Sequence, residues 1–369
     1  MAEKLTVVLA GGGTGGHVYP ALAMGEALSE RGHTLLYFGD ADRLEGRVAP
    51  QRGVPFTPIP ALQYPRAGLA SKLKFAFGLL RTVLYSRRQL KKSGATLVLG
   101  VGGYIAAPPV LAAWTLGIPR IIHESNVTPG MANKLCARVA DLVMVTYEQT
   151  GAKLPGDAPR EVVGCPVNPK VLQGDRAEAA ARYSIDPATP TLLVVGGSLG
   201  AATINEIAQA AVASTGRRFQ IVWITGPRYH DAIDKALGTV PEGVTLVGYE
   251  DRMGDAYAVA DLVLCRAGSS TLAELTVLGK PSILVPSPNV TDNHQEANAR
   301  GLESAGAAVV VVEKDLDVPG TVMEIDVLLS SSERLQAMAD AARTLGQPDT
   351  AGMVADLIEG RFHSSPSGG

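Results

Sequence analysis

Cysteine pairs, aromatic residues and long apolar runs are scarce in this sequence of 369 residues. The cysteines Cys136, Cys165 and Cys265 are odd in number, far apart and without C-x-x-C spacing. They indicate neither a disulfide framework nor a zinc site, and we expect a reducing compartment. No stretch approaches the ~20 apolar residues of a spanning helix. The short N-terminal apolar run ends in glycines, which is typical of a first strand rather than a signal peptide.

Acidic residues are absent from residues 46–123, although the whole chain has a net charge of only −3. The same stretch carries eleven basic residues: Arg47, Arg52, Arg66, Lys72, Lys74, Arg81, Arg87, Arg88, Lys91, Lys92 and Arg120. Such an asymmetry indicates that one face of the protein meets an anionic surface.

Glycine, by contrast, is abundant at 41 residues, which favours an α/β fold with many tight strand-to-helix turns. The length favours two domains. Strands are predicted at 6–10, 34–38, 96–99, 120–123, 142–146, 192–195, 220–225, 244–247, 262–265, 282–285 and 307–312, and helices at about 20–31, 71–92 and 201–212. A Pro- and Gly-rich stretch at 155–169 is interpreted as the connection between two parallel-sheet halves that face a cleft.

The first glycine-rich turn, GGGTGGH at 11–17, separates the first strand from the first helix. Glycines in this context let a phosphate approach the backbone, and the helix start offers N–H groups. The turn also fits the dinucleotide fingerprint, with Asp40 at the end of the next strand. Alone, this motif leaves both an NAD-dependent oxidoreductase and a tight turn without a ligand open.

Two turns in the second half have the same strand–turn–helix context. The turn GGSLG at 196–200 supplies a second anion site, which a dehydrogenase does not need. The segment CRAGSSTLAE at 265–274 places hydroxyl groups at a helix start and Glu274 one turn later. That carboxylate can accept hydrogen bonds from both ribose hydroxyls. The alternative is an ordinary first-turn acid favoured by the helix dipole.

Polar clusters also follow other strands. The segment DNHQEAN at 292–298 contains Gln295, whose amide both donates and accepts as sugar hydroxyls require; the alternative is a solvated loop and helix cap. In the first half, Gly102–Tyr104 and His123–Asn126 end two further strands. Several polar groups that converge at successive strand ends indicate a site more strongly than a lone histidine or glutamate does.

Taken in this order and spacing, the motifs resemble those of the MurG family over nearly the whole chain. The resemblance extends from GGTGGHVYPALA (12–23) through GVGGYIAAP (100–108), IHESN (122–126) and GGSLGA (196–201) to DNHQEANA (292–299). It implies the GT-B fold, in which two Rossmann-like domains face a cleft. The first domain would comprise residues 1–166 and the second 167–339, with a C-terminal helix at about 340–362 packing back on the first.

The resemblance also implies an activity. The family transfers N-acetylglucosamine (GlcNAc) from UDP-GlcNAc to the C4 hydroxyl of the N-acetylmuramyl sugar of Lipid I, with inversion, giving Lipid II for peptidoglycan synthesis. Implied partners are UDP-GlcNAc, the undecaprenyl-pyrophosphate-linked acceptor, an anionic membrane and other cell-wall enzymes, with roles in cell shape and division. The protein would be peripheral, at the cytoplasmic face of the cell membrane. No cofactor, metal or nucleic acid is expected.

By position, the resemblance assigns residues to the donor and the acceptor. The acceptor side would include Gly103 and Tyr104. Donor or substrate contacts would come from Thr14, Gly15, Gly16, Asn126, Asn168, Ser198, Glu250, Arg266, Ser269, Ser270, Thr271, Glu274 and Gln295. The family often has Asn at the position of Cys165, Arg at that of Asn168 and Gln at that of Leu199. Without that arginine, Arg266 is a candidate for the sugar–phosphate contact.

An inverting transfer needs a base that removes the proton of the acceptor hydroxyl. His17 is the first candidate because its unperturbed pKa suits the task, and Glu124 is the second. The D-x-D sequence at 40–42 is a metal motif in other glycosyltransferases, but it lies in the half that is not expected to bind the donor. Rival hypotheses are a transferase of another UDP-sugar to a lipid, an NAD-dependent oxidoreductase and a non-catalytic sugar-nucleotide-binding protein.

A basic and apolar segment between residues 64 and 92 is the candidate membrane face. Its basic residues include Lys72, Lys74, Arg81 and Arg88, interleaved with leucines and phenylalanines. Apolar side chains can enter the headgroup boundary while basic ones meet anionic lipid. Trp114 would join this face if the helix at 107–116 lies beside it. The alternative is that the apolar stripe belongs to the core.

Overall fold

Two parallel sheets organise the chain, one in each of two units. The computed structural model describes residues 4–60, 69–290 and 293–362, with side chains omitted for residues 69–73. One unit consists of the described parts of Met1–Val167 and Gln347–Gly369, and the other is Asn168–Gly346. The chain thus passes from the first unit to the second after Val167 and returns after Gly346, where the sequence analysis placed these points at 166 and 339.

The first unit has a seven-stranded sheet in the order β3-β2-β1-β4-β5-β6-β7. Its strands are β1 Thr6–Ala10, β2 Thr34–Gly39, β3 Phe56–Pro58, β4 Leu97–Gly100, β5 Arg120–Glu124, β6 Leu142–Val145 and β7 Arg160–Val162. All neighbouring strands are parallel. The helices are α1 Gly15–Glu30, α2 Leu44–Gln51, α3 Leu69–Ser93, α4 Ala107–Leu116, α5 Met131–Ala137, α6 Glu148–Gly151 and α15 Thr350–Phe362.

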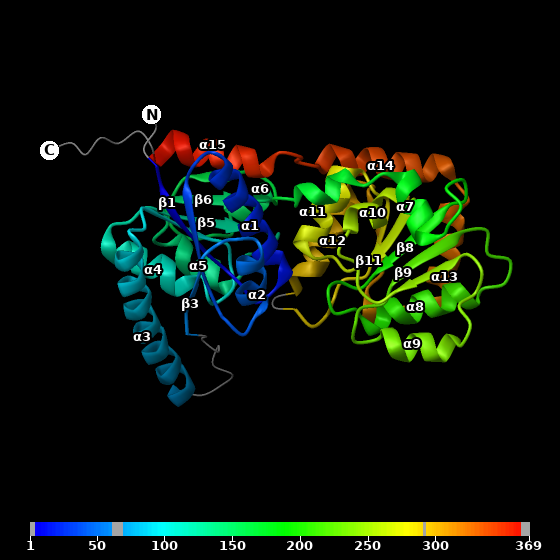
Figure 1. Ribbon diagram of the computed structural model, residues 1–369, viewed down its shortest axis with the longest axis horizontal. Coiled ribbons are helices and arrows are strands. Elements are labelled where there is room, and N and C mark those ends of the chain that lie inside the picture. Colours follow the sequence, from blue (N-terminus) through cyan, green and yellow to red (C-terminus); the bar gives the residue numbers. More distant parts are fainter. Residues whose placement is uncertain (1–3, 61–68, 291–292, 363–369) are drawn as a thin grey trace. The chain divides into compact units, whose positions relative to one another are not determined.

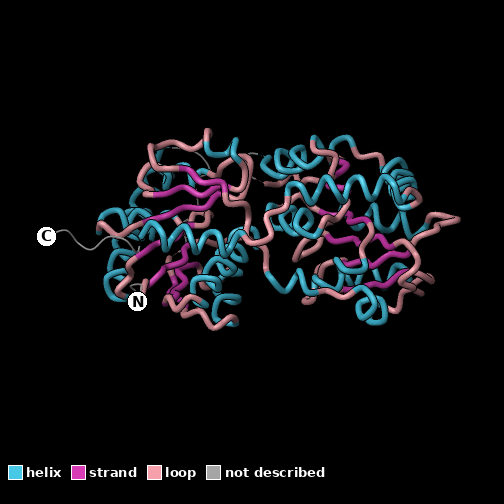
Figure 2. The backbone as a smooth tube through the Cα atoms, turned by 90° about the horizontal axis from the view of Figure 1, so that it is seen from above, coloured by secondary structure: helices cyan, strands magenta, loops and turns pink. Residues whose placement is uncertain are grey.

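The second unit repeats this plan with six parallel strands in the order β10-β9-β8-β11-β12-β13. They are β8 Thr191–Val195, β9 Gln220–Ile224, β10 Val244–Val247, β11 Leu262–Cys265, β12 Ser282–Leu284 and β13 Ala308–Val310. The helices are α7 Arg176–Tyr183, α8 Ala202–Ala213, α9 His230–Leu237, α10 Met253–Val259, α11 Ser269–Leu278, α12 His294–Ser304, α13 Val318–Leu329 and α14 Ser332–Leu345, with 3-10 turns η1 Pro169–Gln173 and η3 Glu313–Asp315. In each unit the strands lie between helices (Figures 1 and 2).

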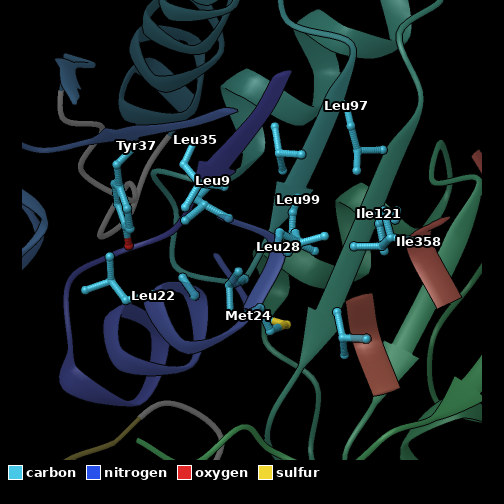
Figure 3. Packing of buried hydrophobic residues seen from close by; sticks show 14 of the residues in the cluster. Leu9, Leu22, Met24, Leu28, Leu35, Tyr37, Leu97, Leu99, Ile121 and Ile358 are labelled. Carbon is cyan, nitrogen blue, oxygen red and sulfur yellow. The ribbon is translucent and has the colours of Figure 1, made fainter. Parts of the chain in front are cut away.

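The central strands are mostly apolar because helices cover both faces of each sheet. Leu9 of β1 and Leu99 of β4 are fully buried, together with Leu22 and Leu28 of α1 (Figure 3). Full burial of each such side chain stabilises the fold by about 1.5–3 kcal/mol. This packing holds the carboxyl ends of β1 and β4, and the turns that follow them, on a rigid base.

The C-terminal helix α15 completes the core of the first unit. Ile358 is fully buried in the same cluster as Ile121 of β5 (Figure 3). At the surface, Arg31 at the end of α1 pairs with Asp356 at 2.6 Å and with Glu359 at 2.9 Å, and it donates to the Gly352 carbonyl. The last helix is therefore a structural part of the first unit, although it is separated from it in sequence.

We expect Arg31→Ala to lower the free energy of unfolding by about 1 kcal/mol, because exposed ion pairs contribute little individually and this arginine makes two. Urea unfolding followed by circular dichroism would measure the change. Arg334→Ala, which removes a single pair with Glu324 in the other unit, is the matched control and should cost less. An equal loss in both variants would show that the Arg31 cluster does not hold α15.

Several predicted boundaries are wrong for local reasons. Helix α1 begins at Gly15 rather than near Pro20 and contains this proline. The φ of proline is compatible with a helix, and its missing N–H removes one hydrogen bond of the helix. The segment 155–169 contains β7, a three-residue edge strand hidden among prolines and glycines. The single helix expected at about 340–362 is two helices, interrupted between Leu345 and Thr350 by a glycine and a proline.

Candidate active site

The strand order of each sheet reverses beside its first strand, between β1 and β4 in one unit and between β8 and β11 in the other. Open α/β sheets bind ligands beyond the carboxyl ends of the strands at such a reversal. The turns at 11–14 and 101–106 follow β1 and β4, and those at 196–201 and 266–268 follow β8 and β11. Each unit therefore presents two of the predicted motifs at its own reversal point.

The turn after β1 is filled by a buried carboxylate, that of Glu45 in α2. Glu45 is 1% exposed, and its Oε2 accepts a hydrogen bond from the Gly13 N–H at 3.0 Å. Its Oε1 accepts from the Asp40 N–H at 3.2 Å. A Cβ at Gly12 would collide with this carboxylate. Glycine at 12 thus leaves room for the Glu45 carboxylate, which occupies the Gly13 N–H.

His17 lies at the start of α1, half-buried above this turn. Its Nδ1 is 3.1 Å from the Gly12 carbonyl oxygen and 3.3 Å from Thr14 Oγ1. A carbonyl only accepts, so Nδ1 carries the proton and Nε2 holds the lone pair of the neutral ring. The side chain is therefore oriented with its basic nitrogen away from the turn.

The turn after β4 lies directly against the first. Gly12 N–H donates to the Gly102 carbonyl at 3.3 Å, and a Cβ at Gly102 would lie 2.9 Å from His17 Nε2. Gly103, with φ +77°, lies so close to the Gly12 carbonyl that a side chain there would collide with it. The structure thus brings His17 and Gly103 together, with the half-buried Tyr104 following in the same turn.

Glu124 at the end of β5 is 2% exposed and accepts four hydrogen bonds. Its Oε1 accepts from the backbone N–H and the side-chain amide of Asn126, and its Oε2 accepts from the Gly130 N–H and Asn133 Nδ2. Four donors leave this carboxylate well satisfied, which favours a role in holding the 124–130 loop over a role as the base. Asn133 Oδ1 is buried and has no hydrogen-bond partner among the described residues.

His123, one residue earlier, is completely buried. Its Nε2 donates to the Gly164 carbonyl at 2.8 Å, and Ser125 Oγ lies 3.3 Å from its Nδ1. Burial lowers the pKa of His123, although its bond to the Gly164 carbonyl opposes this shift. His123 is therefore a neutral, structural histidine beneath the site.

In the second unit, the turn after β8 exposes Ser198 between two glycines with positive φ, Gly197 at +89° and Gly200 at +80°. Gly200 N–H donates to the Gly197 carbonyl at 3.0 Å, which closes the turn. A side chain at Gly200 would collide with the Thr225 carbonyl. The turn is thus rigid and presents its hydroxyl outward.

The start of α11, after β11, gathers the predicted hydroxyl groups and Glu274. Gly268 precedes the helix and supplies no side-chain cap; Ser269 is buried, and Thr271 is half-buried. Ser270 Oγ is also buried, and no described residue hydrogen-bonds to it. A hydroxyl group without a partner at a helix N-terminus can donate a hydrogen bond to a phosphate oxygen.

Glu274, one turn later, is partly accessible and accepts a hydrogen bond from Tyr257 of α10 at 2.8 Å. Burial raises the pKa of Glu274 to about 7, and the tyrosine bond opposes this shift. The charge of this carboxyl group therefore changes near neutral pH. Such a shift is more typical of a functional group than of an ordinary first-turn acid.

Four other predicted side chains make internal contacts. Arg266 donates to the Val285 carbonyl at 3.0 Å and pairs with Glu313, which leaves it poorly placed for the sugar–phosphate contact. Asn168 Oδ1 caps the η1 turn by accepting from the Lys170 N–H. Gln295 Oε1 accepts from the Ser287 N–H at 2.9 Å.

Glu250 is also directed inward. It accepts from Tyr183 at 2.7 Å and pairs with Arg182 at 2.9 Å. These bonds outweigh the effect of burial and lower the pKa of Glu250. Its side chain is structural, and only its backbone is left for a ligand.

The D-x-D sequence shows no metal geometry. Asp40 Oδ1 accepts from the Asp42 N–H, and its Oδ2 lies 3.9 Å from Arg43 Nε. Within the described ranges, no three His, Cys, Asp or Glu side chains are grouped as metal ligands would be.

Residues 69–92 of the segment proposed as the membrane face lie in α3, which packs beside α4 (Figure 1), and residues 64–68 lie outside the described residues. Phe77 is 71% exposed, Leu80 57%, Leu84 51% and Trp114 of α4 54%. These side chains are therefore outside the core. Lys74, Arg81 and Arg88 are exposed on the same helix, whereas the side chain of Lys72 lies outside the described ones. No described helix is long and apolar enough to cross a bilayer.

Comparison with known proteins agrees with this geometry. The chain matches the family model of the glycosyltransferase family 28 N-terminal domain over residues 7–145 and that of the C-terminal domain over 191–353. It is 39% identical, over 95% of each chain, to the UDP-N-acetylglucosamine–N-acetylmuramyl-(pentapeptide) pyrophosphoryl-undecaprenol N-acetylglucosamine transferase of Salinibacter ruber. The chain belongs to the MurG family of glycosyltransferases.

Two further comparisons cover the same length. The protein of the same name from Halothermothrix orenii is 37% identical over 96% of this chain and 98% of its own. The crystal structure of Acinetobacter baumannii MurG superposes with a TM-score of 0.78 at 30% identity, over 97% of this chain and all of the other. The MurG family and its fold of two Rossmann-like domains are thus confirmed.

The sequence analysis of this MurG-family chain missed three residues of the site: Glu45, Asn133 and Tyr257. One feature of the sequence could have indicated Glu45. It is the last acidic residue before the acid-free stretch, and it follows the turn after β2. Asn133 and Tyr257 lie in helices α5 and α10 without a motif. Only their contacts identify them.

Proposed function

We propose that this MurG-family chain transfers GlcNAc from UDP-GlcNAc to the C4 hydroxyl of the N-acetylmuramyl sugar of Lipid I, with inversion at the anomeric carbon. The observation that carries this proposal is the start of α11, where an orphan serine hydroxyl and a carboxyl group of shifted pKa lie one turn apart. The names of the relatives supply the sugar and the acceptor.

The second unit would hold the donor. The Ser198 turn and the Ser269–Thr271 helix start would contact the diphosphate, and Glu274 would accept from the ribose hydroxyls. Gln295 would contact the sugar, a role also assigned to Asn126 of the first unit, and the backbone of Glu250 would contact the uracil. Backbone N–H groups and a helix N-terminus favour the negative charge that develops on departing UDP. The internal bonds of Arg266 and Asn168 make these two the weakest members of the set.

The first unit would supply the base and the acceptor contacts. His17 Nε2 would take the proton of the C4 hydroxyl while the C4 oxygen bonds to the anomeric carbon and the bond to UDP breaks. Thr14, Gly15 and Gly16 would contact the donor or the acceptor, and Gly103 and Tyr104 would contact the acceptor.

An assay with radiolabelled UDP-GlcNAc and a short-chain Lipid I analogue tests the reaction. We expect a labelled disaccharide product with UDP-GlcNAc as the donor. We expect no product when UDP-glucose or UDP-GalNAc is the donor instead. A product formed only from another UDP-sugar would transfer the proposal to a related lipid glycosyltransferase. Thermal stabilisation by NADH but not by UDP would instead support the oxidoreductase hypothesis.

We expect Glu274→Ala to weaken UDP binding about 10- to 150-fold, because a hydrogen bond to a charged group contributes about 1.5–3 kcal/mol. Isothermal titration calorimetry measures the change. Glu178→Ala, which removes an exposed first-turn acid from α7 of the same unit, is the matched control and should leave UDP affinity unchanged. Unchanged affinity in Glu274→Ala as well would remove Glu274 from the site.

The affinity for UDP-GlcNAc should rise as the pH increases through about 7, where Glu274 loses its proton and gains acceptor capacity. UDP-GlcNAc is the suitable ligand because its diphosphate has no terminal phosphate that titrates near this pH. Tyr257→Phe removes a bond that lowers the Glu274 pKa, so the rise in UDP-GlcNAc affinity should move to higher pH.

The pKa of Glu274 is also higher in the folded chain than in the unfolded chain. Its contribution to the free energy of unfolding is therefore lost as the pH rises through about 7.

We further propose that the protein works at the cytoplasmic face of the membrane as a peripheral protein, with α3 and α4 against anionic lipid. Exposed Phe77, Leu80, Leu84 and Trp114 supply apolar contacts beside Lys74, Arg81 and Arg88. A lipid-linked acceptor requires such contact. Other cell-wall enzymes would be its neighbours, and loss of its product would affect cell shape and division.

A further inference from the structure

The peptide group between Gly12 and Gly13 is held at both ends by charged or titratable side chains of the first unit. Its carbonyl oxygen accepts from His17 Nδ1 at 3.1 Å. Its N–H donates to Glu45 Oε2 at 3.0 Å. One peptide therefore connects the imidazole to a carboxylate that is only 1% exposed.

We propose that Glu45 is a positioning residue that orients His17 and favours its protonated form through the Gly12–Gly13 peptide. The inference rests on the proposed function, in which His17 is the base. A carboxylate that accepts from a peptide N–H polarises the peptide and makes its carbonyl oxygen a stronger acceptor. The arrangement does for His17 what a carboxylate bonded directly to Nδ1 does for other catalytic histidines.

The surroundings of the peptide leave it little freedom to turn. Tyr37 OH donates to the Gly11 carbonyl at 3.1 Å, and the Gly12 N–H donates to the Gly102 carbonyl. Gly103 lies so close to the Gly12 carbonyl oxygen that any Cβ would collide with it. The Glu45 carboxylate is close to Gly12 in the same way, and its methylene group is close to Gly39. Each of these glycines lacks a side chain that would push apart His17, the Gly12–Gly13 peptide and Glu45. These three groups are called the relay below.

The chemistry assigns each proton. When His17 Nε2 takes the proton of the acceptor hydroxyl, positive charge spreads to Nδ1–H, which remains bonded to the Gly12 oxygen. In this step Glu45 receives no proton from His17, and its two oxygens keep the hydrogen bonds from the Gly13 and Asp40 N–H groups. The electron pair of the broken bond leaves with UDP.

Other charged groups near His17 come from different elements. His123 of β5 is neutral in the fold and lies close enough to affect His17 electrostatically. Glu124 of β5 bonds to Asn133, whose amide nitrogen lies near Gly102 beside the His17 ring. Asp40 and Arg43 precede Glu45 in the turn that leads into α2 and pair with each other. Among these groups, Glu45 is the one that bonds to the peptide that accepts from His17.

The test is a titration of His17 in the whole enzyme, labelled at its histidine rings for NMR and assigned with His17→Ala. In Glu45→Gln we expect the pKa of His17 to fall by about one unit, as expected for loss of a negative charge several Å away. The acid limb of the kcat–pH profile should shift equally. On the pH-independent plateau kcat should fall by up to about tenfold, because a weaker base accepts the proton more slowly, with UDP affinity unchanged.

Tyr37→Phe is the matched control, because it removes one hydrogen bond from the same turn but no charge. We expect the His17 pKa to stay at its wild-type value in that variant. An unchanged His17 pKa in folded Glu45→Gln would overturn the relay. An equal fall in both variants would also overturn it, since a general loosening of the turn would then explain the shift.

If Glu45→Gln does not fold, the wild-type protein still decides the matter. The relay requires neutral His17 to carry its proton on Nδ1 and the Gly13 amide resonance to shift with the His17 titration. A proton on Nε2, or a Gly13 resonance that ignores the titration, would contradict it. These readouts need no substrate, so they stand apart from the proposed role of His17 as the base, which fails instead if His17→Ala keeps its turnover.

Discussion

Replacing His17 by alanine should lower turnover about 10²- to 10⁴-fold, the usual cost of losing a general base, while UDP binding stays close to wild type. The reason is the geometry of the first unit, where Nδ1 bonds to the Gly12 carbonyl and fixes the orientation of the ring whose Nε2 is the proposed base. UDP is expected to contact the other unit, so its affinity should not depend on this ring. Turnover with a short-chain Lipid I analogue and calorimetry with UDP measure the two quantities separately.

His33→Gln provides the control for loss of an imidazole elsewhere in the same unit. His33 accepts from the Leu5 N–H and bonds to Glu359, and it belongs to none of the turns around His17. Its loss should reduce stability and spare kcat. Added imidazole should restore part of the turnover of His17→Ala if the ring acts as a base. If turnover of His17→Ala remains within a few-fold of wild type, His17 is structural and Glu124→Gln becomes the variant to test.

Reversing the charge of Lys72, Lys74, Arg81 and Arg88 to glutamate should abolish sedimentation with anionic vesicles. Each basic residue near an anionic surface contributes about 1 kcal/mol, so loss of four weakens partitioning on the order of 10³-fold, and the reversed sign adds repulsion. Vesicles of phosphatidylglycerol and phosphatidylethanolamine are the probe, with phosphatidylcholine vesicles for comparison. Binding of the wild-type protein should fall as salt is added, and the variant should lose activity on long-chain Lipid I.

A matched control reverses four exposed basic residues of the second unit: Lys170, Arg218, Lys235 and Lys314. It has the same net charge as the first variant and should still sediment with vesicles. Both variants should keep UDP affinity. Changing Phe77, Leu80 and Leu84 to serine separates apolar insertion from electrostatic attraction. Wild-type sedimentation of the first variant would show that the membrane face lies elsewhere.

The family comparisons confirm the predicted fold class and the family. The sequence could indicate both because the strand and turn patterns involve only neighbouring residues. Strands such as Thr6–Ala10 and Val244–Val247 are short apolar runs bounded by turn residues, and their observed limits match the prediction. The glycine turns are also local, because positive φ at Gly13, Gly197 and Gly200 is a property of a few adjacent residues. Edge strands β3 and β7 have three residues each, too few for a pattern to emerge.

Contacts between distant residues were decided by the tertiary structure alone. Glu45 reaches Gly13 across 32 positions, and Tyr257 reaches Glu274 across 17. Local periodicity carries no information about such pairs. The sequence therefore could not predict that Glu45 contacts the first turn or that Tyr257 bonds to Glu274.

The sequence by itself determined where the parallel strands and their glycine turns lie, and it indicated the family, because these features depend on neighbouring residues. Whether Phe77, Leu80 and Leu84 are core or surface depended on what else packs on α3. Whether Arg266 and Glu124 are available depended on donors and acceptors brought from other strands and loops. Burial and hydrogen bonding between distant segments exist only in the folded chain, so only the tertiary structure could decide them.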